Sequence, residues 1–258
     1  MPLTELYHPE SGRLRIAGLM SGSGSNLRKI IEHGEAIEAR EGRAPYHVVV
    51  IFSDNPAGNA ENIGRDYGIP VIVRDLAAFY KERKKPRRDL VLRAEFDEET
   101  VRALKPFDVD VAAYAGYMSI ATNPLISAFL GVNVHPADLS IIDGNKRKYP
   151  GDHAVRDAIL AGEKYLRATT HIVEQRVDYG RILMISKPLA VTLPDGFDPA
   201  NEDQVKAVSD QHQNTLKEIG DWQIFPRTLE AIADGRYCQD EQGRLYFDDK
   251  PIPNGLML

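Results

Sequence analysis

Short runs of apolar and β-branched residues recur along the first half of the chain, at intervals too long for hairpins. They are bounded by turn residues and lie at 15–19, 47–52, 71–73 and 109–114. Runs of this kind are typical of strands that are buried on both faces of a parallel sheet. The pattern therefore predicts buried parallel strands at these four places.

Segments of helical periodicity separate these runs. Apolar residues fall on one face in 26–36, 57–67 and 88–104, and Asn26 has the side chain of a good N-cap. Strand and helix in alternation imply right-handed crossovers. We therefore expect an α/β fold with a doubly wound, mostly parallel sheet of Rossmann type.

The second half of the chain has a different pattern. Residues 167–175 and 182–191 alternate like strands with only a short turn between them, which predicts an antiparallel strand pair on the same sheet. A helical region over 201–234, with a break expected near Pro226, predicts C-terminal helices. DEQG at 240–243 indicates a small hairpin in the polar tail.

Composition narrows the class of protein. The 258 residues carry 32 Lys and Arg against 38 Asp and Glu, and this net charge of −6 argues against a general nucleic-acid binder. The single Cys238 excludes a disulfide framework and fits a reducing compartment. Without an apolar run of about 20 residues or a signal-peptide pattern, we expect a cytoplasmic protein with no membrane partner. We expect an N-terminal extension over 1–14, one domain over 15–235 and a C-terminal tail over 236–258.

A loop of small residues, SGSGSN at 21–26, lies between the first expected strand and the first expected helix. Small residues let the backbone approach a ligand, and the free N–H groups of a first helical turn suit a phosphate. The loop matches neither the P-loop nor the dinucleotide fingerprint, because the lysine of one and the third glycine of the other are missing. It is either a phosphate-binding loop or a plain tight turn.

Two further segments contain candidate acid–base groups. In GVNVHPADLS at 131–140, Asn133 and His135 alternate along a short strand and so point to the same side. An amide and an imidazole side by side are donors that suit an oxyanion, although a strand histidine is often structural. Farther along, Asp178 precedes Tyr179 in a turn, where a carboxylate is often only a turn residue. The seven histidines contain no metal-ligand motif, so we expect no metal.

Taken in order, these segments resemble the folate-dependent formyltransferases over about residues 15–235. The motifs that carry the resemblance are LMSGSGSNL at 19–27, FSDNPAG at 52–58, GYM at 116–118, NVHPADL at 133–139, KYPGDHAV at 148–155 and VDYG at 177–180. Several ordered motifs are more specific than any single one. KYPG favours the branch of the family that formylates glycinamide ribonucleotide.

The resemblance implies roles for individual residues. Its catalytic set would consist of Asn133, His135 and Asp178, with His171 and His153 in support. Phosphate and acceptor binding would fall on four residues, Gly24, Ser25, Asn26 and Asp221. Folate binding would fall on two short segments, namely Tyr117, Met118, Ser119 and Ile120, and Val177 with Asp178.

The implied reaction is a formyl transfer from the co-substrate 10-formyltetrahydrofolate to a primary amine. Asn133 and a protonated His135 would stabilise the tetrahedral oxyanion, and Asp178 would hold His135 or a water and help to move the proton. The expected partners are therefore small molecules, the formyl folate and a phosphorylated amine, without nucleic acid. A homodimer is left open.

The chain also departs from the family pattern. The connection over 138–147 is longer and more basic, Tyr179 stands where a glycine is usual, Ser119 where an arginine is common, and Asp221 where a glutamate is usual. Formylation of a different amine and hydrolysis of formyltetrahydrofolate therefore stay open, although the hydrolase normally carries a further domain before the first strand. A binding protein without turnover is a third alternative, against which the intact catalytic set argues.

Two segments, 81–88 and 145–148, are unusually basic. Charge runs of this kind are commonly solvated surface loops. If the substrates are anions, the same charges instead form an electrostatic rim on an otherwise acidic protein.

Overall fold

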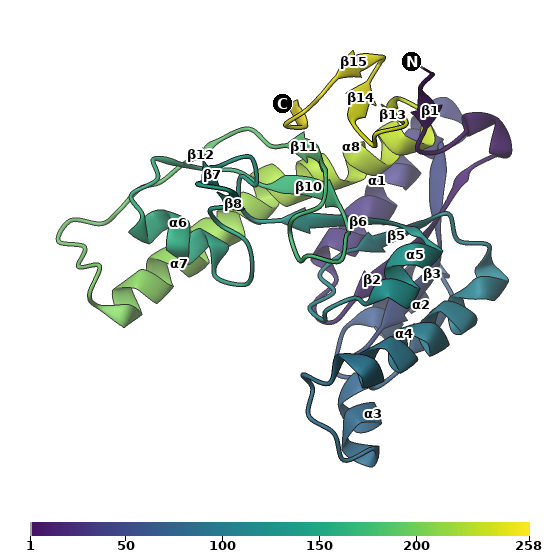
Figure 1. Cartoon of the computed structure of the whole chain (residues 1–258), viewed down its shortest axis with the longest axis horizontal. Helices are drawn as coiled ribbons and strands as arrows, with labels where there is room; N and C mark the ends of the chain where they lie inside the picture. The colour runs from purple at the N-terminus through teal and green to yellow at the C-terminus, as the bar shows by residue number, and fades with distance from the viewer. Residues whose placement is uncertain (1) are drawn as a thin grey trace.

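The computed structural model describes residues 2–258. Its centre is an eight-stranded sheet in the order β16-β11-β10-β6-β5-β2-β3-β4 (Figure 1). The strands of this sheet are β2 Leu14–Met20, β3 Tyr46–Ser53, β4 Val71–Val73, β5 Val111–Tyr114, β6 Leu130–His135, β10 Thr169–Ile172, β11 Ile182–Ile185 and β16 Leu256–Met257. From β6 to β4 the neighbours run parallel, whereas β10 is antiparallel to both β6 and β11. The predicted mostly parallel sheet with an antiparallel pair is confirmed.

Helices cover both faces of the sheet. In β2, Ile16 and Met20 contribute to one hydrophobic core and Ala17 and Leu19 to the other, because successive strand residues point to opposite faces. The first core is covered by α1 Ser25–Glu41, α2 Ala60–Tyr67 and α8 Trp222–Ala233, and residues of α6 Ala154–Leu160 and α7 Glu202–Leu216 also belong to it. The second is covered by α3 Leu76–Glu82, α4 Leu90–Leu104 and α5 Asn123–Ala128, with the short turn η2 Lys105–Phe107 after α4.

Two helices and two small strand pairs lie outside the central sheet. Helices α6 and α7 pack together on the left of Figure 1. Two short antiparallel pairs lie near them, β7 Ile142–Asp143 with β8 Lys146–Arg147, and β9 Tyr165–Leu166 with β12 Leu189–Ala190. The β7–β8 hairpin occupies the basic 138–147 connection. Within residues 2–258, none of the helices combines the length and apolar character needed to cross a membrane.

The two ends of the chain meet in a second sheet. Its four strands are β1 Thr4–Glu5, β13 Tyr237–Gln239, β14 Leu245–Phe247 and β15 Lys250–Pro251, and the turn η1 Pro9–Ser11 precedes β2. Strands β13 and β14 pair antiparallel around residues 240–243, so the predicted hairpin is confirmed. The domain limits at residues 14 and 235 stay a prediction.

The break in the predicted helix 201–234 lies elsewhere than expected. The chain leaves regular α-helix in a π-helical turn, η3 Lys217–Asp221, whereas Pro226 lies inside α8. Proline lacks the N–H of an interior helical bond, but Pro226 comes so soon after the π-turn that only an early bond of α8 is lost. The prediction of a break at Pro226 was therefore wrong.

The predicted strand pair is shorter than its sequence pattern. Strand β10 covers Thr169–Ile172 of the expected 167–175, and β11 ends at Ile185. The rest of the expected second strand leaves the central sheet, and β12 pairs with β9 instead. Alternation of side chains alone does not show where a strand changes its partner.

Candidate active site

The predicted catalytic residues Asn133 and His135 lie at the carboxyl end of β6, on one edge of the central sheet. Strands β6, β5 and β2 are adjacent and parallel, so their carboxyl ends meet at the same edge. The chain leaves β2 toward β3 on one side, while β5 and β6 lie on the other. Such a reversal of strand order opens the crevice in which α/β sheets bind ligands.

The side chains of Asn133 and His135 project from β6 next to His171 on β10. In this antiparallel pair Asn133 lies opposite His171. The amide nitrogen of Asn133 is 3.3 Å from Nε2 of His171, and Nδ1 of His171 donates to the carbonyl oxygen of Ile172 at 2.9 Å. His171 is thus fixed in the orientation in which its Nε2 faces the site.

Asp178 joins this group from the turn after β10. One carboxylate oxygen is 3.4 Å from Nδ1 of His135 and accepts the N–H of Gly151 at 2.8 Å, and the other oxygen is 3.4 Å from Nε2 of His171. His135, His171 and Asp178 are all buried. The structure therefore brings the predicted catalytic set together with His171.

Burial and neighbouring charges act in opposite directions on these groups. Burial alone would raise the pKa of the Asp178 carboxyl, but His171, His135 and the N–H of Gly151 outweigh it and lower the pKa to about 2. Burial lowers the pKa of His135 from its ordinary value, and the Asp178 carboxylate only partly opposes this shift. Asp178 is therefore ionised at neutral pH, whereas the imidazole of His135 is mainly neutral in the unliganded chain.

Arg147 and Tyr149 are contacts of this site that the sequence analysis did not single out. The guanidinium of Arg147 donates to the carbonyl oxygens of Asp178 and Gly180, and the carbonyl oxygen of Tyr149 lies 2.8 Å from Nε2 of His135. Tyr149 belongs to the KYPG motif, which was a signal for the family. The contact between the Tyr149 carbonyl oxygen and His135 depends on how the chain returns toward β6. No local sequence pattern predicts this contact.

The predicted phosphate loop wraps around the start of α1. Gly24 has φ +71°, and a Cβ atom there would lie 2.4 Å from Ile63 and 2.8 Å from Met20, so only glycine fits. Ser25 is the first helical residue and Gly24 is the N-cap, which makes the prediction of Asn26 as N-cap wrong. Because Asn26 lies inside the first turn, its side chain does not cap the helix.

Asp221 and Asn26 form a second buried polar group. Burial raises the pKa of the Asp221 carboxyl to about 7, against the opposing effects of Asn26 and Lys217. Within residues 2–258, the buried atoms Oδ1 of Asn26, Oδ1 of Asp221 and Nε1 of Trp222 have no hydrogen-bond partner. Unpaired buried polar atoms are costly, and they are typical of a place that a polar ligand completes. Asp221 ends a π-helical turn, an irregularity that is frequent at functional sites.

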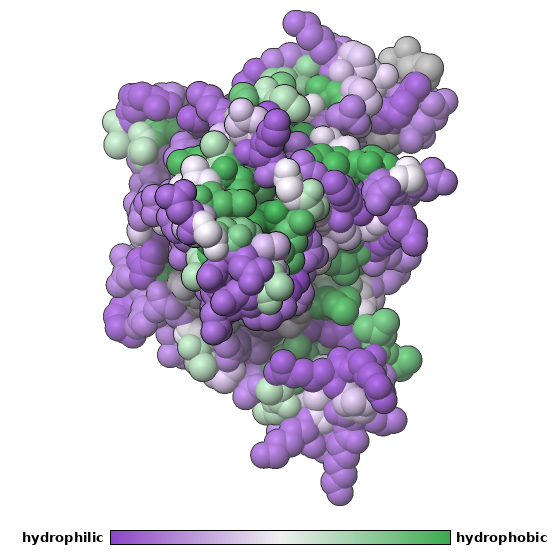
Figure 2. Space-filling view, turned by 90° about the vertical axis from the view of Figure 1, so that its left-hand side faces the viewer, coloured by the Kyte–Doolittle hydropathy of each residue, from purple (hydrophilic) through white to green (hydrophobic). Residues whose placement is uncertain are grey.

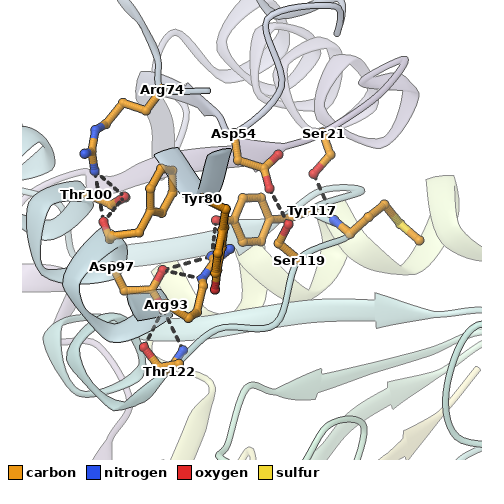
Figure 3. Close-up of polar contacts among 12 residues, drawn as sticks. Ser21, Asp54, Arg74, Tyr80, Arg93, Asp97, Thr100, Tyr117, Ser119 and Thr122 are labelled. Atoms are coloured by element: carbon orange, nitrogen blue, oxygen red, sulfur yellow. Dashed lines mark hydrogen bonds and ion pairs between the residues drawn. The ribbon is translucent and has the colours of Figure 1, made fainter. Parts of the chain in front are cut away.

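Hydrogen bonds to neighbouring elements hold the segment that is predicted to bind folate (Figure 3). Tyr117 points into the core, where Arg93 donates to its hydroxyl, so its side chain supports the segment. Ser119 donates to Asp54, and the N–H of Met118 donates to Ser21 at 3.0 Å, which ties this segment to the phosphate loop.

Three apolar side chains of the predicted folate site are left facing solvent. Met118 is 71% exposed, Ile120 54% and Val177 52%. Figure 2 shows hydrophobic residues in the middle of one face with hydrophilic residues around them. His153, by contrast, is exposed at the N-cap of α6, and within residues 2–258 no hydrogen bond or ion pair joins its side chain to the catalytic group. Within residues 2–258, no three His, Cys, Asp or Glu side chains are arranged to hold a metal ion.

The fold and these motifs define a known class. The family model of the formyl transferases matches residues 14–207, and the chain belongs to this family. A solved glycinamide ribonucleotide transformylase 1 from Symbiobacterium toebii superposes with a TM-score of 0.67 at 27% identity, covering 91% of this chain and 94% of the other.

Curated relatives extend the comparison. The phosphoribosylglycinamide formyltransferase of Mycobacterium tuberculosis is 32% identical over 68% of this chain and 71% of its own length. The trifunctional purine biosynthetic protein adenosine-3 of Drosophila melanogaster is 30% identical over 86% of this chain. The chain spans only 14% of the length of that trifunctional protein and 20% of its Bos taurus counterpart.

Proposed function

We propose that the protein transfers the formyl group of 10-formyltetrahydrofolate to the primary amine of glycinamide ribonucleotide, a step of purine synthesis. The amine nitrogen attacks the formyl carbon and forms a C–N bond while the carbonyl oxygen becomes an oxyanion. When the tetrahedral intermediate collapses, the bond from the formyl carbon to the folate nitrogen breaks. One proton passes from the attacking nitrogen to the folate nitrogen. The chain's task is to hold the two substrates in line and to stabilise the charge.

The observation that carries this proposal is the arrangement of Asn133, His135 and Asp178 at the carboxyl edge of β6. The Asn133 amide supplies an N–H donor for the oxyanion. His135 is mainly neutral at rest, and a negative charge that forms beside it favours its protonation. Imidazolium is thus stabilised mostly when the intermediate forms, and Asp178, 3.4 Å away, compensates its charge.

Both ring nitrogens of His135 face acceptors of the protein. Nε2 lies 2.8 Å from the Tyr149 carbonyl oxygen and Nδ1 lies 3.4 Å from Asp178. For His135 to donate to the formyl oxygen, one of these contacts has to be released as substrate binds. Nε2 is held by the hydrogen bond to Tyr149, whereas the contact of Nδ1 with Asp178 is longer, so we infer that the ring moves on the Asp178 side.

The acceptor amine and its phosphate have matching groups in the chain. The N–H groups at the start of α1, behind Gly24 and Ser25, suit the phosphate. Asp221, with a pKa of about 7, is partly ionised at neutral pH, and the unpaired oxygens of Asn26 and Asp221 can accept the N–H groups of the neutral amine. The proposed reaction has two small anionic substrates and involves no nucleic acid, membrane or metal.

Two differences from the resembling family favour a second acceptor. Asp221 is one methylene shorter than the glutamate usual in the resembling family, and the β7–β8 hairpin lengthens the 138–147 connection. Either change alters the space for the amine. We therefore keep another phosphorylated primary amine as the alternative acceptor.

Incubation with 10-formyltetrahydrofolate, with and without glycinamide ribonucleotide, tests the proposal by the absorbance of the folate product and the mass of the formylated amine. We expect folate product only when both substrates are present, and almost none with Asp178→Asn. Formate release without the amine would establish a hydrolase instead. Folate product with another phosphorylated amine but none with glycinamide ribonucleotide would establish the alternative acceptor.

A further inference from the structure

Arg147 connects the β7–β8 hairpin with the turn that carries Asp178. One terminal nitrogen of its guanidinium donates to the carbonyl oxygen of Asp178, and the other donates to that of Gly180 at 2.7 Å. The side chain is half-buried, so its contacts are shielded from water. A planar guanidinium can donate to two acceptors at a fixed spacing, which an ammonium cannot do.

The turn held in this way has an unfavourable backbone. Asp178 has φ +55°, in the left-handed region that residues other than glycine adopt only at a cost in energy. Gly180 lies so close to the end of β10, the preceding strand, that a Cβ atom would be 1.7 Å from the carbonyl oxygen of Ile172. The backbone of this turn is therefore unfavourable at Asp178 and tightly packed at Gly180. The position of Asp178 depends on the contacts that hold the carbonyl oxygens of these two residues.

Small displacements of this turn matter because the carboxylate of Asp178 serves several partners at once. It has to reach His135 and His171, each at 3.4 Å, and the N–H of Gly151 at 2.8 Å. A shift of about 1 Å at a catalytic group can lower a rate about 100-fold.

Two departures of this chain from the resembling family meet at Arg147. The longer 138–147 connection supplies the arginine, and Tyr179 replaces a glycine in the turn. The ring of Tyr179 lies near two guanidinium groups, with Arg176 at 3.3 Å and Arg147 at 5.7 Å from its centroid. The inserted hairpin is thus bound to the altered turn.

We propose that Arg147 is a positioning residue, which holds the Asp178 turn in the geometry that formyl transfer needs. This inference rests on the proposed function. It also gives the hairpin a role other than the basic rim, because the Arg147 charge is directed inward at backbone carbonyls and not toward solvent.

Two variants separate the geometry of the fork from its charge. Arg147→Lys keeps the positive charge but cannot bridge both carbonyl oxygens, and we expect kcat to fall about tenfold or more while the KM for glycinamide ribonucleotide stays within about threefold. Arg147→Ala leaves room for a free guanidinium ion. We expect tens of millimolar guanidinium chloride, roughly 50 mM, to restore part of its kcat, because the ion can replace the lost fork.

Matched controls keep the result specific. Arg102→Gln removes an exposed guanidinium from α4 and should leave kcat unchanged, and His135→Ala should gain nothing from guanidinium. Unfolding temperatures are measured for every variant, so that a loss of kcat in a well-folded protein is separated from instability. Wild-type kcat in Arg147→Lys, or equal guanidinium rescue of His135→Ala, would overturn the proposal.

A readout without activity separates this inference from the proposed function. If the wild-type chain transfers no formyl group to any amine, the proposed function is wrong. The amide proton of Gly151 still reports the position of the Asp178 carboxylate, because it is hydrogen-bonded to that carboxylate. By NMR we expect this proton to move upfield in Arg147→Lys as the carboxylate withdraws. An unchanged signal would overturn the positioning role.

Discussion

His135 combines two properties that a catalytic imidazole needs and a structural one does not. Its burial keeps it mainly neutral in the unliganded chain, and a carboxylate with a pKa of about 2 lies 3.4 Å away to compensate a positive charge. In the proposed mechanism, an oxyanion beside the ring would offset the cost of burying this charge. This is the behaviour of a group that stabilises the transition state more than the bound substrate.

Replacement of His135 by alanine tests this behaviour. We expect kcat to fall about 100-fold or more, because a charge-stabilising donor is removed from the transition state. The dissociation constant of the folate, measured by fluorescence titration, should stay within about twofold, because the loss is not one of ground-state binding. A variant that keeps more than about a third of the wild-type kcat would exclude the role.

Asp221 links function to stability through pH. Its pKa is raised to about 7 in the folded chain, so the folded state holds a proton that the unfolded state releases near pH 4. This group therefore favours folding at low pH, and its contribution is lost as pH rises from about 4 through 7. Such a carboxyl is retained at a cost in stability at neutral pH.

Asp221→Asn should make that cost measurable. An amide needs no ionisation, so we expect urea unfolding at pH 8 to show a gain of about 1–3 kcal/mol over wild type, with little difference at pH 4. The KM of the amine acceptor should rise because the negative charge is lost. Equal stability of the two proteins at pH 8 would show that burial does not raise the pKa of Asp221 in the folded chain.

Residues differ in how far the sequence alone could predict their roles. The common side of Asn133 and His135 follows from strand alternation, and it holds in the structure. The approach of Asp178 to both imidazoles needs the β10–β6 pairing, and the roles predicted for it from the family stay predictions. Arg147 contacts a turn that lies 31 residues farther along, and no local pattern reports such a contact.

At the scale of elements, hydrophobic periodicity predicted those strands and helices whose position is decided by packing against the core. The buried runs became β2, β3, β4 and β5, and the main helices followed. The sequence pattern did not predict irregular backbone at places where a local preference of one residue competes with packing. The π-turn before α8 is one, and the cap of α1 is another, because a left-handed glycine replaced the expected asparagine.

Helix α4 supports the predicted folate segment through a buried ion pair. Arg93 and Asp97 are 3% and 0% exposed and 2.8 Å apart. Arg93 also donates to Tyr117, and Asp97 accepts the N–H of Thr122 at 2.7 Å (Figure 3). The pair thus holds the segment at both ends.

Arg93→Met should break this support. Removing the cation leaves Asp97 buried without its partner, and we expect urea unfolding to show a loss of about 3–5 kcal/mol. In the folded fraction the KM for the folate should rise more than that for the amine. Tyr117→Phe, which removes only one hydroxyl, should cost about 1 kcal/mol. A loss below that in Arg93→Met would mean that water or another group replaces the arginine.

At the scale of the whole molecule, the two basic segments differ. In 145–148, Arg147 is directed inward and Lys148 pairs with Glu163 at 2.8 Å, so little of this charge is free to form a rim. Residues 81–88 are all exposed and follow α3, which lies at the bottom of Figure 1. Since β4 leads into α3, this segment lies on the side of the carboxyl edge of the sheet, where the site is.

A triple variant tests whether these charges steer anionic substrates. It replaces Lys84, Arg87 and Arg88 by glutamine. We expect kcat/KM to fall several-fold at low salt and to match wild type near physiological ionic strength and above, because exposed charges are screened over about 8 Å there. The kcat should be unchanged, since steering acts on encounter and not on chemistry. As a control, Arg43, Arg102 and Lys105 replaced together remove the same charge at the far ends of α1 and α4. A response of both triple variants to salt by the same factor would show an effect of net charge, and no response in the first would leave 81–88 as a solvated loop.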